Sequence, residues 1–150
     1  MLVVDWIQLS SIFCLITLAK AGTSMTPIRV VCIEDESEMI DLVSIILSRE
    51  GYQVIGAPGG IQGLQIVEDT QPELVLLDLM MPDLDGWEVY QRLKSNPKTT
   101  SVPIIVVTAR AQSIDKILGL HIAKVDDYIT KPFSPTELLS SIEKVLSKKA

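Results

Sequence analysis

The stretch from Glu73 to Glu88, ELVLLDLMMPDLDGWE, decides the fold and raises the question of function. The apolar run Leu74 to Leu77 predicts a buried strand, and Asp78 ends that run. A lone carboxylate is rarely buried, because removing its charge from water costs several kcal/mol or more. Asp78 therefore needs a partner from another part of the chain.

Four more short apolar runs accompany this one, and helical patterns separate them. The expected strands cover residues 28–33, 52–56, 74–78, 103–107 and 128–130. The expected helices begin near Ser37, Ile61, Trp87, Ser113 and Ser134. Ser37 is the expected N-cap of the first helix and Gly51 its stop, while Ser134 to Glu137 has the form of a capping box. This alternation predicts an α/β fold with a parallel sheet covered on both faces.

Polar groups follow the expected strands. Glu34 and Asp35 come after the first strand, Asp78 ends the third, Thr108 follows the fourth and Lys131 follows the fifth. Because functional groups of such sheets gather at the carboxyl ends of the strands, these side chains should converge. Carboxylates that repel one another favour a hard cation such as Mg²⁺. With a lysine and a hydroxyl nearby, the set suits a phosphoryl group, which Asp78 could accept as an acyl phosphate.

Residues 28–148 resemble the response-regulator receiver domain, the phosphoacceptor module of two-component signalling. The matching stretches, in order, are VVCIEDE, ELVLLDLMMPDLDGWEV, VPIIVVTA and DDYITKPFSPTELL. The resemblance implies a doubly wound, flavodoxin-like (βα)5 fold in three layers. It also implies a parallel five-stranded sheet with strand order 2-1-3-4-5.

The resemblance implies a role for each matching site residue. Asp78 would be the phosphorylation site. Mg²⁺, with Mn²⁺ as an alternative ion, would be bound by Glu34, Asp35, Asp78 and the backbone carbonyl of Met80.

Three further residues would respond to the phosphoryl group. The resemblance implies that Lys131 and Thr108 contact the phosphoryl group, and that Thr108 and Tyr128 act as the switch pair. A cis peptide would join Lys131 to Pro132.

Two positions depart from the family pattern. Lys124 replaces a small residue at the end of the helix expected at 113–120, on a surface where partners often dock. Met80, two residues after Asp78, has no polar side chain at a position that tunes acyl-phosphate hydrolysis in this family. We therefore expect slow self-dephosphorylation. Asp83 is expected to have no direct chemical role, and Asp85 and Gly86 are expected to shape the turn into the next helix.

The expected function follows from the resemblance. A histidine kinase or histidine phosphotransfer protein would pass its phosphoryl group to Asp78, and the domain would catalyse only its own phosphorylation and dephosphorylation, not turnover of an external substrate. The signal would reach an effector protein through the face built by helix 113–120, strand 128–130 and the last helix. A homodimer is also possible. The sequence ends at Ala150, soon after the last helix, which predicts output by protein contact unless the chain is a fragment of a longer regulator.

Composition and motif spacing weigh against other functions. The formal net charge of −6 disfavours direct nucleic-acid binding. A phosphatase of the haloacid-dehalogenase type needs a second carboxylate where Met80 stands, and a flavodoxin-like cofactor site needs a Ser/Thr/Gly-rich loop where the chain reads EDESEM. A pseudo-receiver that only docks is disfavoured because the acidic pair, acceptor, threonine and lysine are all present.

Residues 1–24 form an apolar extension that precedes the domain of residues 25–150. Three interpretations stay open: a signal peptide, a membrane anchor, or an overlong start with Met25 as the true first residue. We favour the third, because MTPIRVVCIEDE reads as a complete beginning, and because the apolar run from Trp6 to Ala19 is too short to span a bilayer. Two cysteines without ligand-like spacing fit a reducing, cytoplasmic location.

Overall fold

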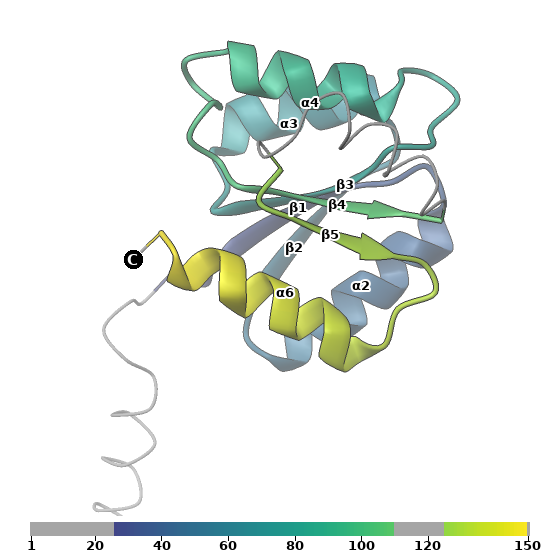
Figure 1. Ribbon diagram of the computed structural model, residues 1–150, viewed down its shortest axis with the longest axis vertical. Helices are drawn as coiled ribbons and strands as arrows, with labels where there is room; N and C mark the ends of the chain where they lie inside the picture. Colours follow the sequence, from purple (N-terminus) through teal and green to yellow (C-terminus); the bar gives the residue numbers. More distant parts are fainter. Residues whose placement is uncertain (1–25, 110–124, 150) are drawn as a thin grey trace, which may run out of the picture.

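The computed structural model describes residues 26–109 and 125–149 (Figure 1). Its centre is a five-stranded parallel sheet with strand order β2-β1-β3-β4-β5, which confirms the expected topology. The strands are β1 (Arg29–Ile33), β2 (Gln53–Ala57), β3 (Leu74–Asp78), β4 (Ile104–Thr108) and β5 (Asp127–Thr130).

Helices cover both faces of the sheet. The described helices are α2 (Ser37–Arg49), α3 (Gly60–Thr70), α4 (Gly86–Ser95) and α6 (Pro135–Ser147). In Figure 1, α3 and α4 lie on one face and α2 and α6 on the other, which gives the expected three layers. The helix expected at 113–120, Lys124 and the extension 1–24 lie outside the described residues.

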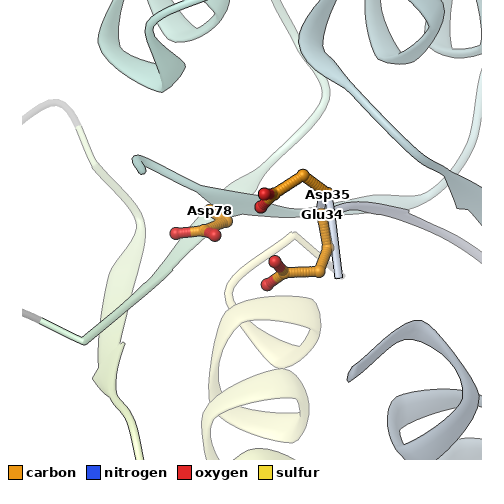
Figure 2. Close-up of side chains that lie close together, drawn as sticks. All are labelled: Glu34, Asp35 and Asp78. Atoms are coloured by element: carbon orange, nitrogen blue, oxygen red, sulfur yellow. The ribbon is translucent and has the colours of Figure 1, made fainter. Parts of the chain in front are cut away.

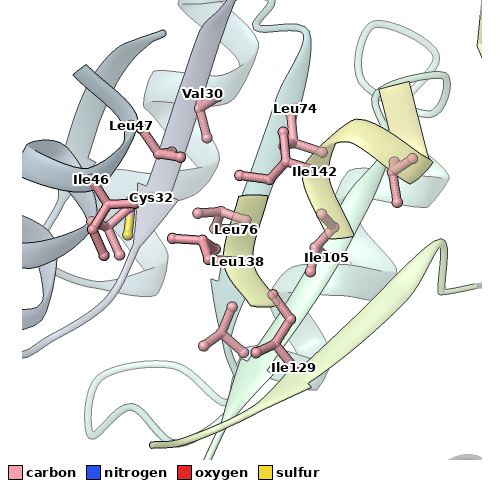
Figure 3. Close-up of a cluster of buried hydrophobic side chains, with 13 residues drawn as sticks. Val30, Cys32, Ile46, Leu47, Leu74, Leu76, Ile105, Ile129, Leu138 and Ile142 are labelled. Carbon is pink, nitrogen blue, oxygen red and sulfur yellow. The ribbon is translucent and has the colours of Figure 1, made fainter. Parts of the chain in front are cut away.

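The apolar runs of the sequence form two cores, one on each face of the sheet. The first packs side chains of alternate strand residues against Leu47 of α2 and Leu138 of α6 (Figure 3). The second packs the intervening strand residues against Val67 of α3 and Val89 of α4. Every residue of β3 and β4 is buried, because both faces of these central strands are covered. Asp78 is thus the polar end of a strand that is otherwise entirely core.

The helix ends agree with the sequence in part. The capping box of α6 is present, with Ser134 Oγ accepting from the Glu137 amide and the Glu137 side chain accepting from the Ser134 amide. Gly51, with a φ of 86°, follows the end of α2 as expected. The prediction that Ser37 caps α2 is wrong. Glu36 occupies the N-cap position without a side-chain cap bond, and Ser37 is the first helical residue.

Within the described ranges 26–109 and 125–149, no helix combines the length and the apolar character that crossing a lipid bilayer would require.

Candidate functional site

Three carboxylates meet at the carboxyl ends of β1 and β3. Glu34 and Asp35 directly follow β1, and Asp78 ends the neighbouring strand β3. One oxygen from each carboxylate lies within 4.8 Å of the others, and Figure 2 shows the three side chains side by side. Glu34 and Asp78 are buried, whereas Asp35 is exposed to solvent. This acidic cluster can hold a metal ion, because it offers several oxygen ligands at an open edge.

Lys131 brings a positive charge to the cluster. It follows β5, and its amide donates to the Thr108 carbonyl oxygen at 2.9 Å, which ties it to the end of β4. Its Nζ lies 2.5 Å from Glu34 Oε2 and 3.5 Å from Asp78 Oδ2. The Lys131–Pro132 peptide is cis, as the resemblance implied. Lys131 therefore supplies the partner that the burial of Asp78 requires.

Burial and close charges shift two pKa values in the site. Burial raises the pKa of Glu34 to about 7; the hydrogen bond from Lys131 opposes this rise, and neighbouring Asp78 adds to it. Burial works against the charged form of Lys131, but its hydrogen bond to Glu34 and the nearby charge of Asp78 hold its pKa above the usual value. Lys131 thus stays an ammonium ion, while Glu34 holds its proton more tightly than an ordinary carboxyl group.

The loop after β3, residues 79–85, is held tightly against Asp78. The Met80 amide donates to Asp78 Oδ1 at 3.0 Å, and the Gly86 amide donates to the Leu79 carbonyl oxygen at 3.2 Å. A Cβ at position 86 would lie 2.3 Å from the Asp78 carbonyl oxygen, so only glycine fits there. Asp85 caps α4 by accepting from the Trp87 amide at 2.7 Å, which confirms that Asp85 and Gly86 shape this turn.

The expected switch residues lie at the ends of β4 and within β5. The Thr108 side chain is fully buried, and Tyr128 is 50% exposed. Ile105 and Val107 of β4 belong to the core under α2 and α6, whereas Ile104 belongs to the other core. The register partner of Asp78 is Val107, and Thr108 directly follows Val107 at the end of β4. The two residues are therefore neighbours at the carboxyl edge of the sheet.

Asp83 has a structural role that the sequence did not reveal. Its carboxylate oxygens Oδ1 and Oδ2 accept hydrogen bonds from the amides of Gly60 and Ile61, each at 3.2 Å. These are the first two amides of α3, a helix that is 22 or 23 residues away in sequence. No local sequence pattern predicts this contact, because it depends on how closely the loop of residues 79–85 approaches α3 in the fold.

Comparison with known proteins agrees with this geometry. The family model for the response regulator receiver domain matches residues 30–143. The DNA-binding dual master transcriptional regulator RpaA of Synechocystis is 41% identical over 120 residues, which cover 80% of this chain and 49% of RpaA. The chain spans about half the length of the curated relatives it matches.

Solved structures show the same arrangement of elements. A CheY-like response regulator receiver domain protein from Methanospirillum hungatei has a TM-score of 0.75 at 29% identity, covering 83% of this chain and 97% of that one. The receiver domain of the Pseudomonas aeruginosa sensor histidine kinase PA1611, which has a magnesium ion coordinated in its active-site cleft, has a TM-score of 0.73 at 26% identity. The match covers 81% of this chain and 99% of the PA1611 receiver domain. The chain therefore belongs to the response regulator receiver domain family of two-component signalling.

Proposed function

We propose that Asp78 accepts a phosphoryl group from a phosphohistidine of a histidine kinase or histidine phosphotransfer protein. The observation that carries this proposal is the placing of Asp78 at the end of a buried strand, with Glu34 and Asp35 within 4.8 Å and Lys131 Nζ 3.5 Å away. An acceptor oxygen, a cation-binding pair and a fixed ammonium group are the parts that phosphoryl transfer to a carboxylate needs.

The donor set suits Mg²⁺, and Mn²⁺ would fit the same ligands. Three carboxylates and one ammonium group leave a formal charge of −2 when all are ionised, which a divalent cation would neutralise. Oxygen ligands with one exposed member, Asp35, leave room for the waters that Mg²⁺ retains. The ligands would be Glu34, Asp35, Asp78 and the Met80 carbonyl oxygen. When bound, the ion would supply Lewis-acid stabilisation of the charge that develops on the phosphoryl oxygens.

Asp78, Met80 and Lys131 have different roles in the proposed phosphoryl transfer. An Asp78 carboxylate oxygen attacks phosphorus, the bond from phosphorus to the donor imidazole nitrogen breaks, and the electron pair leaves with the imidazole. The Met80 amide, 3.0 Å from Oδ1, fixes the carboxylate plane during this attack. Lys131, close to Oδ2, offsets the charge of the transferred group. Hydrolysis by water would later return Asp78 to the carboxylate.

Phosphorylation would be transmitted by Thr108 and Tyr128. A phosphoryl group on Asp78 offers new acceptor oxygens, and rotation of the Thr108 hydroxyl toward them would leave space beneath β4. Tyr128, half exposed in this structure, would turn inward. An open groove of about 470 Å³ runs beside Tyr128 between β5 and α6, with Thr130 and Lys144 among its lining residues. Movement of Tyr128 would reshape this groove, which supports the face of β5 and α6 as the docking surface for an effector or a second copy.

The output partner would be a separate protein or a module of the same polypeptide. Since RpaA is named as a DNA-binding transcriptional regulator and this chain covers only 49% of it, a DNA-binding output module is the favoured partner class. The receiver itself, with its net charge of −6, would act by protein contact in the cytoplasm and not on nucleic acid directly.

Phosphorylation by a small phosphodonor tests this function. The protein is incubated with an acyl phosphate or phosphoramidate, with Mg²⁺ or with a chelator, and its intact mass is measured. We expect a gain of one phosphoryl group that requires the divalent cation. A protein that binds Mg²⁺ but gains no mass from any donor would contradict the proposal.

A further inference from the structure

Asp83 links two parts of the molecule that are far apart in sequence. It lies in the loop of residues 79–85, and its carboxylate caps the start of α3 through the amides of Gly60 and Ile61. The N-cap of α3 is Gly59, which has no side chain to accept these bonds. A helix start needs such acceptors, because its first amides have no partner within the helix. The cap of α3 therefore comes from the loop that follows Asp78.

The fit between this loop and α3 requires small residues. A Cβ on Gly59 would lie 2.8 Å from Asp83 Oδ2, although the extended φ of 178° at Gly59 suits any residue. A Cβ on Gly60 would lie 2.8 Å from Val89 Cγ2 and 3.0 Å from Leu84 Cβ. The Gly-Gly pair at the start of α3 thus lets the loop approach until the carboxylate of Asp83 meets the helix amides.

The same loop carries Met80, and its two ends are fixed differently. On the Asp78 side, the Met80 amide binds Asp78 Oδ1. Beyond Met80, the side chains of Met81 and Leu84 contact the core under α3 and α4. This apolar packing anchors the loop but does not fix the direction of its backbone carbonyl groups. The paired hydrogen bonds of Asp83 add a directional tie, because both carboxylate oxygens are held by backbone amides.

We propose that Asp83 is a positioning residue of the metal site, which holds the carbonyl group of Met80 in place by anchoring the loop to the start of α3. This inference rests on the proposed function, since the Met80 carbonyl is a ligand only there. Outer partners that orient metal ligands commonly change affinity by tenfold or more when removed. The amides of Ile61 and Gly60 hold the pKa of Asp83 below its usual value, so the tie stays ionised throughout the range in which a carboxylate site binds metal.

The first measurement is Mg²⁺ binding by isothermal titration calorimetry. Asp83→Ala should weaken binding by roughly tenfold while all four proposed ligands remain. Asp69→Ala is the matched control, because Asp69 is an exposed acid near the far end of the same helix and accepts a hydrogen bond from Gln65. Asp69→Ala should bind Mg²⁺ as the unmodified chain does. Equal affinity in all three proteins would overturn the inference.

A second variant separates positioning from simple helix capping. Gly59→Asp combined with Asp83→Ala gives α3 a cap from its own N-cap position, and the oxygen that would contact the new Cβ is gone. It also returns a negative charge to the same region. We expect the midpoint of urea unfolding to recover while Mg²⁺ binding stays weak. Recovery of both would show that Asp83 only caps the helix, and would overturn the inference.

Failure of this inference can be told from failure of the proposed function. If the unmodified chain binds no Mg²⁺, the proposed metal site is wrong. If the unmodified chain and Asp83→Ala bind it equally, only the role of Asp83 is wrong. Amide resonances provide an independent readout: Mg²⁺ should shift the Gly60 and Ile61 signals in the unmodified chain, and these shifts should disappear in Asp83→Ala. Shifts that persist in Asp83→Ala would contradict the linkage.

Discussion

Lys131 Nζ lies 2.5 Å from Glu34 Oε2, in an ion pair between residues 97 positions apart in the chain. The two side chains are 12% and 3% exposed, so water screens them little. A cation that enters the acidic cluster must therefore compete with Lys131 for Glu34. This competition gives the site a measurable signature in stability, in pH dependence and in metal affinity.

Replacing Lys131 should destabilise the metal-free protein more than the metal-bound one. Lys131→Met leaves Glu34 and Asp78 without their cation, and we expect the free energy of unfolding to fall by about 3 kcal/mol, as for a broken buried pair. Saturating Mg²⁺ should restore most of this loss, because the ion replaces the missing charge. Urea unfolding with a chelator and with Mg²⁺ measures both values.

Lys144→Met is the control for this comparison. Lys144 pairs with Asp127 at 3.6 Å, but its side chain is 57% exposed. Its loss should therefore cost less than about 1 kcal/mol. If Lys131→Met were as mild as Lys144→Met without metal, the account of the buried pair would be wrong.

The metal-free protein should lose stability as the pH rises from about 4.5 to 7. The Glu34 carboxyl has an ordinary pKa of 4.5 and a folded-state pKa of about 7. Below the lower value both states hold the proton; between the two values only the folded state holds it, so unfolding releases a proton. The stabilisation, up to about 3 kcal/mol, is complete below the unfolded pKa and is lost as the pH passes through the folded pKa.

Glu34→Gln should flatten this pH profile, as measured by urea unfolding at several pH values in chelator. Glu73→Gln is the matched control. Partial burial opposes ionisation of Glu73, but the hydrogen bonds from Arg29 lower its pKa below the usual value, which confines its effect to more acidic solutions. Saturating Mg²⁺ should reverse the slope, because the ion requires ionised Glu34. A profile that stays flat from pH 4.5 to 7 in the unmodified, metal-free protein would contradict this assignment.

Gly86→Ala should be among the costly glycine substitutions. The new Cβ would lie 2.3 Å from the Asp78 carbonyl oxygen and 2.5 Å from Leu79 Cα, both backbone atoms that cannot move alone. We expect a loss of about 3 kcal/mol in urea unfolding, as for an overpacked core. Gly51→Ala meets no atom within 4 Å and should cost about 1 kcal/mol through its φ of 86° alone. Equal costs at the two glycines would refute the close approach at Gly86.

Met80→Asn should shorten the life of the phosphorylated state. Met80 is 48% exposed two residues after Asp78, and its thioether cannot orient an attacking water. One added hydrogen bond to that water would speed hydrolysis roughly tenfold, or about 1.4 kcal/mol in the barrier. The decay of the phosphoryl mass after donor removal measures this rate. Ile61→Asn, at an exposed position near the loop, should leave the rate unchanged.

An unchanged lifetime in Met80→Asn would remove Met80 as the residue that sets the duration of the signal.

The order of elements and much of the site could be predicted because their signals are local. The short apolar run LVLLD predicted a strand covered on both faces, which its complete burial confirms, and the capping box at Ser134 uses groups three residues apart. Convergence of Glu34, Asp78 and Lys131 followed from parallel strands, whose carboxyl ends share one edge.

Other features depend on packing that no short pattern encodes. Ser37 has the right residue type for a cap, but the turn after Asp35 places the N-cap one residue earlier, at Glu36, so Ser37 is the first helical residue. The cap that α3 receives from Asp83 joins distant segments, and its clue, the pair Gly59-Gly60, has meaning only once the loop is seen against the helix. The placing of Thr108 directly after Val107, the register partner of Asp78, likewise required the sheet register.

The central claim is that Asp78 is the site of phosphorylation. Intact-protein mass spectrometry of matched variants tests it most directly. The unmodified chain, Asp78→Asn and Asp85→Asn are each incubated with a small phosphodonor and Mg²⁺. Asp85 is the control acid because it lies in the same segment and caps α4. The account predicts one phosphoryl group on the unmodified chain and on Asp85→Asn, and none on Asp78→Asn. A phosphoryl gain that persists in Asp78→Asn would contradict it.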